Sequence, residues 1–173
     1  YSDIMLALFC VYLCGGDHIE DITTILNKYL STAPNARIPS SDTIARGLKE
    51  LRALSIAYTS KTGSIYAHDP ALKLNSLLLD MTLLLGLLKR GQYIDVDFDN
   101  EFIPTEKSDA LYSYKKKRGY FPGVMASGPL IIGLENRQGN SNVKFEQVEE
   151  LSRMLDNIES HGLYVRMFRA DCG

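Results

Sequence analysis

Aspartates occupy every second position of YIDVDFDN, residues 93–100, a segment that otherwise reads as a buried strand. Side chains alternate between the two faces of a strand, so Asp95, Asp97 and Asp99 share one face and apolar residues share the other. Neighbouring positions on one face are only ~7 Å apart, so the negative charges repel one another. The pattern predicts a strand that buries one face and presents a row of carboxylates on the other.

Another aspartate, Asp171, directly follows LYVRMFRA, residues 163–170, which we predict to be a strand. Three strands, a helix and this fourth strand predict an antiparallel meander followed by a crossover. A right-handed crossover can return the fourth strand parallel to the first, and the strand order 3-2-1-4 then brings Asp171 to the edge that holds the aspartate row. Converging carboxylates supply the hard oxygen ligands that a divalent cation needs, and the cation offsets their repulsion.

The elements that position these carboxylates follow from hydrophobic spacing, which changes from helical to alternating at Gly91. The sequence predicts a helical domain over residues 1–90 and a mixed sheet with a crossover helix over residues 91–173. The fold class is therefore α+β or α/β. The predicted helices cover about 2–14, 17–30, 41–54, 70–89 and 143–160, and the predicted strands cover 93–103, 120–125, 130–135 and 163–170. Residues 33–42 are predicted to be a loop, and residues 61–70 a loop or a short hairpin.

The composition is that of an ordinary globular protein, with 45% hydrophobic residues, 23% charged residues and a net charge of −2. The three cysteines form no disulfide framework, and Cys10 and Cys14 are expected to be small buried hydrophobic residues. The apolar run over residues 77–88 contains Asp80 and is shorter than the ~20 residues of a membrane span. With no signal peptide evident, we expect a soluble, cytoplasmic protein without membrane contact.

An unbroken basic run follows the acidic segment and consists of Lys115, Lys116, Lys117 and Arg118. A basic run is commonly a solvated hairpin. Phosphate contact is an equal alternative, because carboxylates at a metal site would repel DNA unless basic groups nearby offset them. Three tyrosines lie around this run, namely Tyr112, Tyr114 and Tyr120. Their rings could stack on bases or pack in the sheet.

Several motifs together resemble the DDE transposases of bacterial insertion sequences, which carry a ribonuclease-H-like catalytic domain. The resemblance rests on the D-x-D strand, the GYFP segment, the R-x-G-N turn within ENRQGN and the terminal RADCG. The helical start, with GGDHIEDI and IPSSDTIARGL, resembles the amino-terminal region of one such group. The resemblance therefore covers most of the chain.

This resemblance implies a catalytic pair and a cofactor. The first acid of the family stands in a D-x-T motif, which matches Asp97, with Asp99 in place of the threonine and Asp95 as the alternative. The second acid matches Asp171, and the third, a glutamate, lies downstream in the family and is assigned to no residue of this sequence. Asp97, Asp171 and Asp95 are then the expected ligands of a two-metal Mg²⁺ or Mn²⁺ site that cleaves and joins DNA strands. Without the third acid we expect the 173-residue chain to bind DNA weakly and not to cut it.

The partners implied are double-stranded DNA at the transposon ends and the target, and a second copy of the chain in a synaptic complex, near the bacterial nucleoid. Lys115–Arg118 are the expected phosphate contacts. Arg137 and Asn140 are expected to shape their turn as their main role and to contact DNA as a secondary one. Two other classes stay open. One is a DNA-binding or dimerising fragment without catalysis, and the other is a D-x-D metal-dependent glycosyltransferase that holds a nucleotide sugar.

Overall fold

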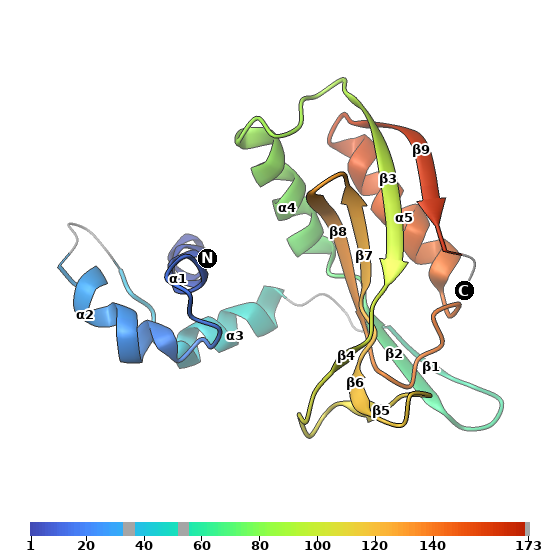
Figure 1. Cartoon of the computed structure of the whole chain (residues 1–173), viewed down its shortest axis with the longest axis horizontal. Coiled ribbons are helices and arrows are strands. Elements are labelled where there is room, and N and C mark those ends of the chain that lie inside the picture. The colour runs from blue at the N-terminus through green and yellow to red at the C-terminus, as the bar shows by residue number, and fades with distance from the viewer. Residues whose placement is uncertain (33–36, 52–55, 172–173) are drawn as a thin grey trace. The chain divides into compact units, whose positions relative to one another are not determined.

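The computed structural model describes residues 1–32, 37–51 and 56–171, and it divides into two compact units, Tyr1–Leu51 and Arg52–Gly173 (Figure 1). The sequence predicts a boundary at residue 90, whereas the structure has it between Leu51 and Arg52. The difference arises because the residues between these two positions include a hairpin that is part of the sheet of the second unit and a helix that packs in its core.

The first unit is helical, as its apolar spacing predicts. Its elements are the α-helix α1 (Ser2–Leu13), the π-helix η1 (Ile22–Leu26) and the α-helices α2 (Asn27–Leu30) and α3 (Ser41–Leu51). Buried apolar side chains from three of these elements pack together, including Val11 of α1, Ile22 of η1 and Ile44 of α3. The predicted loop over 33–42 lies partly outside the described residues, as does the predicted end of the third helix.

The second unit is built on a six-stranded mixed sheet with the order β1-β2-β8-β7-β3-β9. Its strands are β1 (Ile56–Thr59), β2 (Ile65–Asp69), β3 (Tyr93–Asn100), β7 (Gly123–Ser127), β8 (Leu130–Arg137) and β9 (Tyr164–Ala170). Strands β3, β7 and β8 form an antiparallel meander, and β9 lies parallel to β3. The predicted order 3-2-1-4 is therefore confirmed for these four strands, and the architecture is mixed α and β.

A hairpin extends the sheet beyond the predicted strands. Of the two alternatives for residues 61–70, the hairpin is the one observed: β1 and β2 pair antiparallel, and β2 continues the sheet beside β8. Residues 56–69 therefore belong to the sheet rather than to a helical domain.

Two helices cover one face of the sheet, namely α4 (Leu72–Leu84) and α5 (Gln147–Ser160) (Figure 1). Leu79 of α4 and Ile158 of α5 are fully buried against the apolar face of β3, where Val96 is also fully buried. The burial of one face by both helices leaves the alternate residues of β3 on the opposite face.

A small second sheet lies between β3 and β7 in the chain, with the order β4-β6-β5. Its strands are β4 (Ile103–Pro104), β5 (Leu111–Tyr112) and β6 (Arg118–Tyr120). The predicted strand over 93–103 thus ends at Asn100 and is followed by a separate short strand. The basic run begins in the turn between β5 and β6.

Among the described helices, none combines the length and the apolar character that a bilayer crossing requires. The apolar run at residues 77–88 belongs largely to α4, which is 13 residues long.

Candidate functional site

The aspartate row is carried by β3, whose two faces differ as the sequence predicts. Ile94, Val96 and Phe98 are almost fully buried, whereas Asp95 and Asp97 are only half-buried and Asp99 is exposed. The apolar side chains anchor the strand in the core beneath α4 and α5. The strand therefore holds the carboxylates on the face that the helices do not cover.

Two arginines of β9 neutralise part of this row. Arg166 donates from Nε and Nη2 to the two carboxylate oxygens of Asp95, both at 2.8 Å. Arg169 pairs with Asp97 in the same manner, at 2.6 and 2.9 Å. Hydrogen bonds from Arg166 hold the pKa of Asp95 below its usual range, and the same two pairings raise the pKa values of both guanidinium groups. Bidentate pairs of this kind fix both side chains in orientation.

A β-bulge lets both arginines reach the same face. Ile94 pairs with Val165 but Asp95 pairs with Met167, so Arg166 is the extra residue of β9. A bulge re-aims the side chain of the extra residue. Position in the sequence alone would have placed Arg166 and Arg169 on opposite faces.

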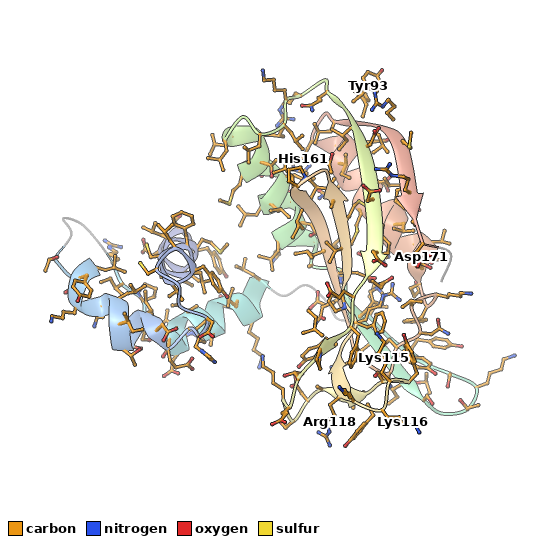
Figure 2. All side chains as sticks on the ribbon, in the orientation of Figure 1. Tyr93, Lys115, Lys116, Arg118, His161 and Asp171 are labelled. Atoms are coloured by element: carbon orange, nitrogen blue, oxygen red, sulfur yellow. The ribbon has the colours of Figure 1, made fainter. Side chains whose placement is uncertain are left out.

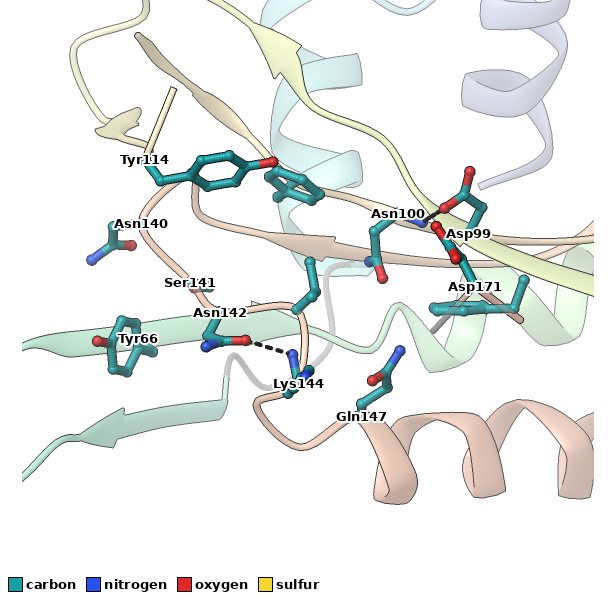
Figure 3. A pocket seen from close by; sticks show the side chains of 14 residues that line it. Tyr66, Asp99, Asn100, Tyr114, Asn140, Ser141, Asn142, Lys144, Gln147 and Asp171 are labelled. Atoms are coloured by element: carbon teal, nitrogen blue, oxygen red, sulfur yellow. Dashed lines mark hydrogen bonds between the residues drawn. The ribbon is translucent and has the colours of Figure 1, made fainter. Parts of the chain in front are cut away.

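Asp171 lies where the crossover argument expects it, at the carboxyl end of β9 beside the carboxyl end of β3. Phe98 and Ala170 form the last pair between β3 and β9, so Asp99 and Asp171 are the next residues of these two strands. Asp99, Asn100 and Asp171 line one cavity of about 570 Å³, and Figure 3 shows them grouped at one end of it. The two strands thus bring Asp171 together with Asp99.

The predicted ligands differ in their freedom to bind a cation. The carboxylates of Asp95 and Asp97 are engaged by arginines, so either must leave its arginine to bind a metal ion. Asp99 accepts a hydrogen bond from the backbone N–H of Asn100 at 2.8 Å and has no arginine partner in the described part of the chain. Its position in the D-x-D pattern was visible in the sequence, but the register that joins it to Asp171 was not.

The donors at this end of the cavity fit a hard divalent cation. Two carboxylates and the side-chain amide of Asn100 offer oxygen ligands, and the exposure of Asp99 and Asp171 leaves coordination positions for water or phosphate oxygens. This is the donor chemistry that Mg²⁺ and Mn²⁺ prefer.

The basic run divides into two parts. Lys115 stands over three aromatic rings, with its Nζ 5.4 Å from the ring centroid of Phe102 and 5.8 Å from those of Tyr114 and Phe121. Contacts of this length are cation–π interactions, so they restrain Lys115. The other three basic residues line a separate open depression on the small sheet, and Figure 2 shows Lys116 and Arg118 there. Arg118 also lies over a ring, that of Tyr112 at 5.2 Å, but it lines the depression together with Lys116 and Lys117, whereas Lys115 does not. We therefore expect Lys116, Lys117 and Arg118 to be the available phosphate contacts.

Arg137 is a structural residue, and its predicted contact with DNA is not compatible with its position. Its side chain is fully buried. Its Nε donates to Glu135 at 2.5 Å, and its Nη1 donates to the carbonyl oxygens of Asn142 and Phe145. Arg137 therefore ties β8 to the loop before α5, because the guanidinium has enough donors to reach both.

Asn140 also shapes its turn, as predicted, since its Nδ2 donates to the carbonyl oxygen of Ile65 at 3.0 Å. It lines the same cavity as Asp99 and Asp171. A ligand in that cavity would therefore lie close to the R-x-G-N turn.

A buried ionic cluster beneath the sheet was not predicted from the sequence. His68 of β2, Glu135 of β8 and Glu150 of α5 bring ligand-type atoms close together. Two arginines already supply opposite charge, because Arg137 pairs with Glu135 and Arg153 donates to Glu150 at 2.6 Å. A cation would add positive charge to a neutralised interior, so the cluster is better suited to join three elements than to bind metal.

The two glutamates of this cluster differ in acidity. Burial raises the pKa of Glu135 despite its pairing with Arg137. Burial acts in the same direction on Glu150, but the hydrogen bonds from His68 and Arg153 outweigh it and lower the pKa of that carboxyl group. Glu150 is therefore the residue of the cluster that is stabilised as a carboxylate.

A second acidic group, on the first unit, also has a structural role. Asp21 accepts hydrogen bonds from the backbone N–H groups of Asp17 and His18, both at 3.2 Å. This arrangement closes the turn that precedes η1 and uses the carboxylate as a backbone partner.

No protein-family model matches the chain, and no curated protein matches it.

Proposed function

We propose that this chain is part of a metal-dependent DNA transposase of the DDE type, with a ribonuclease-H-like catalytic domain. The observation that carries the proposal is the parallel pairing of β9 with β3, which gives Asp171 and Asp99 a shared cavity. The chain brings together two acids that are far apart in sequence, and it does so at the end of two parallel strands. Carboxylates at such an edge are suited to phosphoryl transfer with Mg²⁺ or Mn²⁺.

The residues of the cavity have separate tasks in this proposal. Asp99 and Asp171 hold the cation, and Asp97 joins them when Arg169 releases it. When bound, the divalent cation lowers the pKa of an attacking hydroxyl group and stabilises the leaving oxygen. The exposed carboxylates leave room for a phosphate group of the DNA strand. The buried face of β3 keeps the ligands in place through its packing against Leu79 and Ile158.

Double-stranded DNA at transposon ends and at the target is the proposed substrate, and a second copy of the chain is the proposed partner in the complex that joins two ends. Lys116, Lys117 and Arg118 are the proposed phosphate contacts, because they are exposed and line one depression. They offset the repulsion between the carboxylates and the DNA backbone.

Salt-dependent DNA binding tests this function. Fluorescence anisotropy with a duplex should show an affinity that falls steeply with salt, because each neutralised phosphate releases counterions. The variant Lys116→Ala/Lys117→Ala should weaken binding to every sequence alike and reduce the slope of log K against log salt by about 0.9 for each lost contact.

The matched control is Lys73→Ala/Lys89→Ala, which removes the same charge from exposed positions in and after α4. Its salt slope should stay close to that of the wild-type chain. An equal loss of DNA affinity in both variants would contradict a DNA contact at the β5–β6 hairpin.

A further inference from the structure

The cavity that holds Asp99 and Asp171 extends well past these carboxylates. Its volume of about 570 Å³ is in the range of small-molecule sites. Aromatic rings line the part away from the acids, and Figure 3 shows Tyr114 and Tyr66 there. A metal site alone does not require this additional space or these rings.

Tyr114 is the ring best placed to receive a ligand. It is 77% exposed, and its centroid lies 6.1 Å from that of Phe121, which is buried beneath it. The ammonium group of Lys115 lies over both rings and restrains them. Tyr114 therefore presents an exposed aromatic face that is held in place before any ligand binds.

Amide side chains supply hydrogen-bonding groups along the same cavity. Within the described residues, Gln147 at the start of α5 has no hydrogen-bond partner for its side chain, and the Nδ2 of Asn142 has none either. The Oδ1 of Asn140 is buried and also lacks a partner. Lys144 adds a positive charge to the wall. The cavity thus combines a stacking surface with unused donors and acceptors.

We propose that this cavity binds one unpaired nucleotide of a DNA strand, next to the phosphate whose oxygens would complete the proposed cation site at Asp99 and Asp171. The base stacks on Tyr114, and its edge faces the amides of Asn140, Asn142 and Gln147. Both the face and the edge of a base are occupied in a duplex, so this site selects a nucleotide that has left the stack. The inference rests on the proposed function and adds a preference for locally opened DNA.

A nucleic acid strand fits the surroundings of the cavity better than an isolated sugar nucleotide. The basic depression formed by Lys116, Lys117 and Arg118 lies on the small sheet that also carries the start of the Tyr114 turn. A strand that enters the cavity with one nucleotide has further phosphates available for these residues. A sugar nucleotide has no further phosphates along a chain to use them.

The experiment measures binding of a short single-stranded oligonucleotide that carries one 2-aminopurine, with the 173-residue chain in EDTA. Stacking on Tyr114 should quench the fluorescence of this base, and a fully paired duplex of the same sequence should show little quenching. Tyr114→Ala should weaken single-strand binding roughly five- to 150-fold, the range for loss of one base–aromatic stack. Tyr114→Phe should keep binding close to that of the wild-type chain.

Tyr93→Ala is the matched control, because Tyr93 is an exposed tyrosine of the same unit whose ring packs on Tyr164 and which does not line the cavity. Equal quenching and affinity in Tyr114→Ala and the wild-type chain would overturn the proposal. So would displacement of the oligonucleotide by a sugar nucleotide with loss of the preference for an unpaired base.

The use of EDTA separates this proposal from the metal-dependent function. Nucleotide binding that depends on Tyr114, together with Mn²⁺ binding that does not depend on Asp171, would support the nucleotide site and contradict the metal site. Nucleotide binding that does not depend on Tyr114, together with Mn²⁺ binding that depends on Asp171, would contradict the nucleotide site alone.

Discussion

Arg169 is the residue with which a cation would compete for Asp97. Its guanidinium group holds both carboxylate oxygens of Asp97, and both side chains are about half exposed. Exposed ion pairs contribute little to stability, typically about 0–1 kcal/mol. The pair can therefore open at low cost when a divalent cation competes for Asp97.

Removal of this arginine should strengthen metal binding. In Arg169→Ala, Asp97 keeps its charge and loses its competitor, so we expect Mn²⁺ affinity to rise several-fold in a calorimetric titration. Arg166→Ala frees Asp95 instead. Asp95 lies further from Asp99 along β3 than Asp97 does, so this variant should have a smaller effect on Mn²⁺ affinity. Weaker Mn²⁺ binding by Arg169→Ala would show that the arginine supports the site instead of competing with it.

At the residue scale, alternation in YIDVDFDN was sufficient to predict which side chains of β3 are buried. It could not predict the arginine pairs, because these depend on a bulge opposite Asp95 that changes the register of β9. It also could not identify the aspartate nearest Asp171. That choice depends on the pairing of Phe98 with Ala170, which is set by packing between distant segments.

Glu150 links elements that are distant in the chain. It lies on α5, accepts hydrogen bonds from Arg153 and has His68 of β2 at 3.5 Å, and His68 and Glu135 of the cluster are buried with it. The hairpin β1–β2, which pairs with β8, is thus also tied to the crossover helix by a charged group.

The acidity of Glu150 predicts how stability depends on pH. Its pKa in the folded chain is lowered from the usual value of about 4.3, so its contribution is present above that pH and is lost as the pH falls through the lower folded-state value. Glu150→Gln should reduce the free energy of unfolding at pH 7 by about 1.5–3 kcal/mol, the range for hydrogen bonds to a charged group. The difference from the wild-type chain should shrink in acid.

Urea denaturation between neutral and acidic pH measures this difference, and Glu149→Gln provides the control on the exposed side of the same helix. A deficit in Glu150→Gln that stays constant into acid would show that the carboxylate charge is not what stabilises the cluster.

At the element scale, helical and alternating periodicity predicted the meander, the crossover helix and the parallel fourth strand. The hairpin at 56–69 was less visible, because its strands are short and only its last residues are buried. Four- and five-residue strands carry too few alternations for a reliable pattern. Because this hairpin belongs to the second unit, the boundary between the units lies before the hairpin and not at residue 90 as predicted.

On the scale of the whole molecule, each unit has its own apolar core. Leu79 is fully buried in the core of the second unit, and Ile44 is fully buried in the core of the first. A substitution in one core should therefore act mainly on the unit that contains it.

Leu79→Ala tests this independence. The lost burial and the remaining cavity should cost the second unit about 2–5 kcal/mol, and hydrogen exchange should quicken in residues 56–171 far more than in α1 and α3. The control is Leu84→Ala on the same helix, which is 86% exposed and should change stability by less than about 0.5 kcal/mol. Equal acceleration of exchange in both units would mean that they unfold together.

The central claim is that Asp171 and the aspartates of β3 bind one divalent cation, and Mn²⁺ binding followed by electron paramagnetic resonance tests it most directly. The wild-type chain should bind Mn²⁺, and both Asp171→Asn and Asp99→Asn should lose most of that affinity, because each removes a charged ligand from the same cavity. Asp156→Asn, the same change at an exposed position of α5, should bind as the wild-type chain does. Undiminished Mn²⁺ binding by Asp171→Asn would contradict the account.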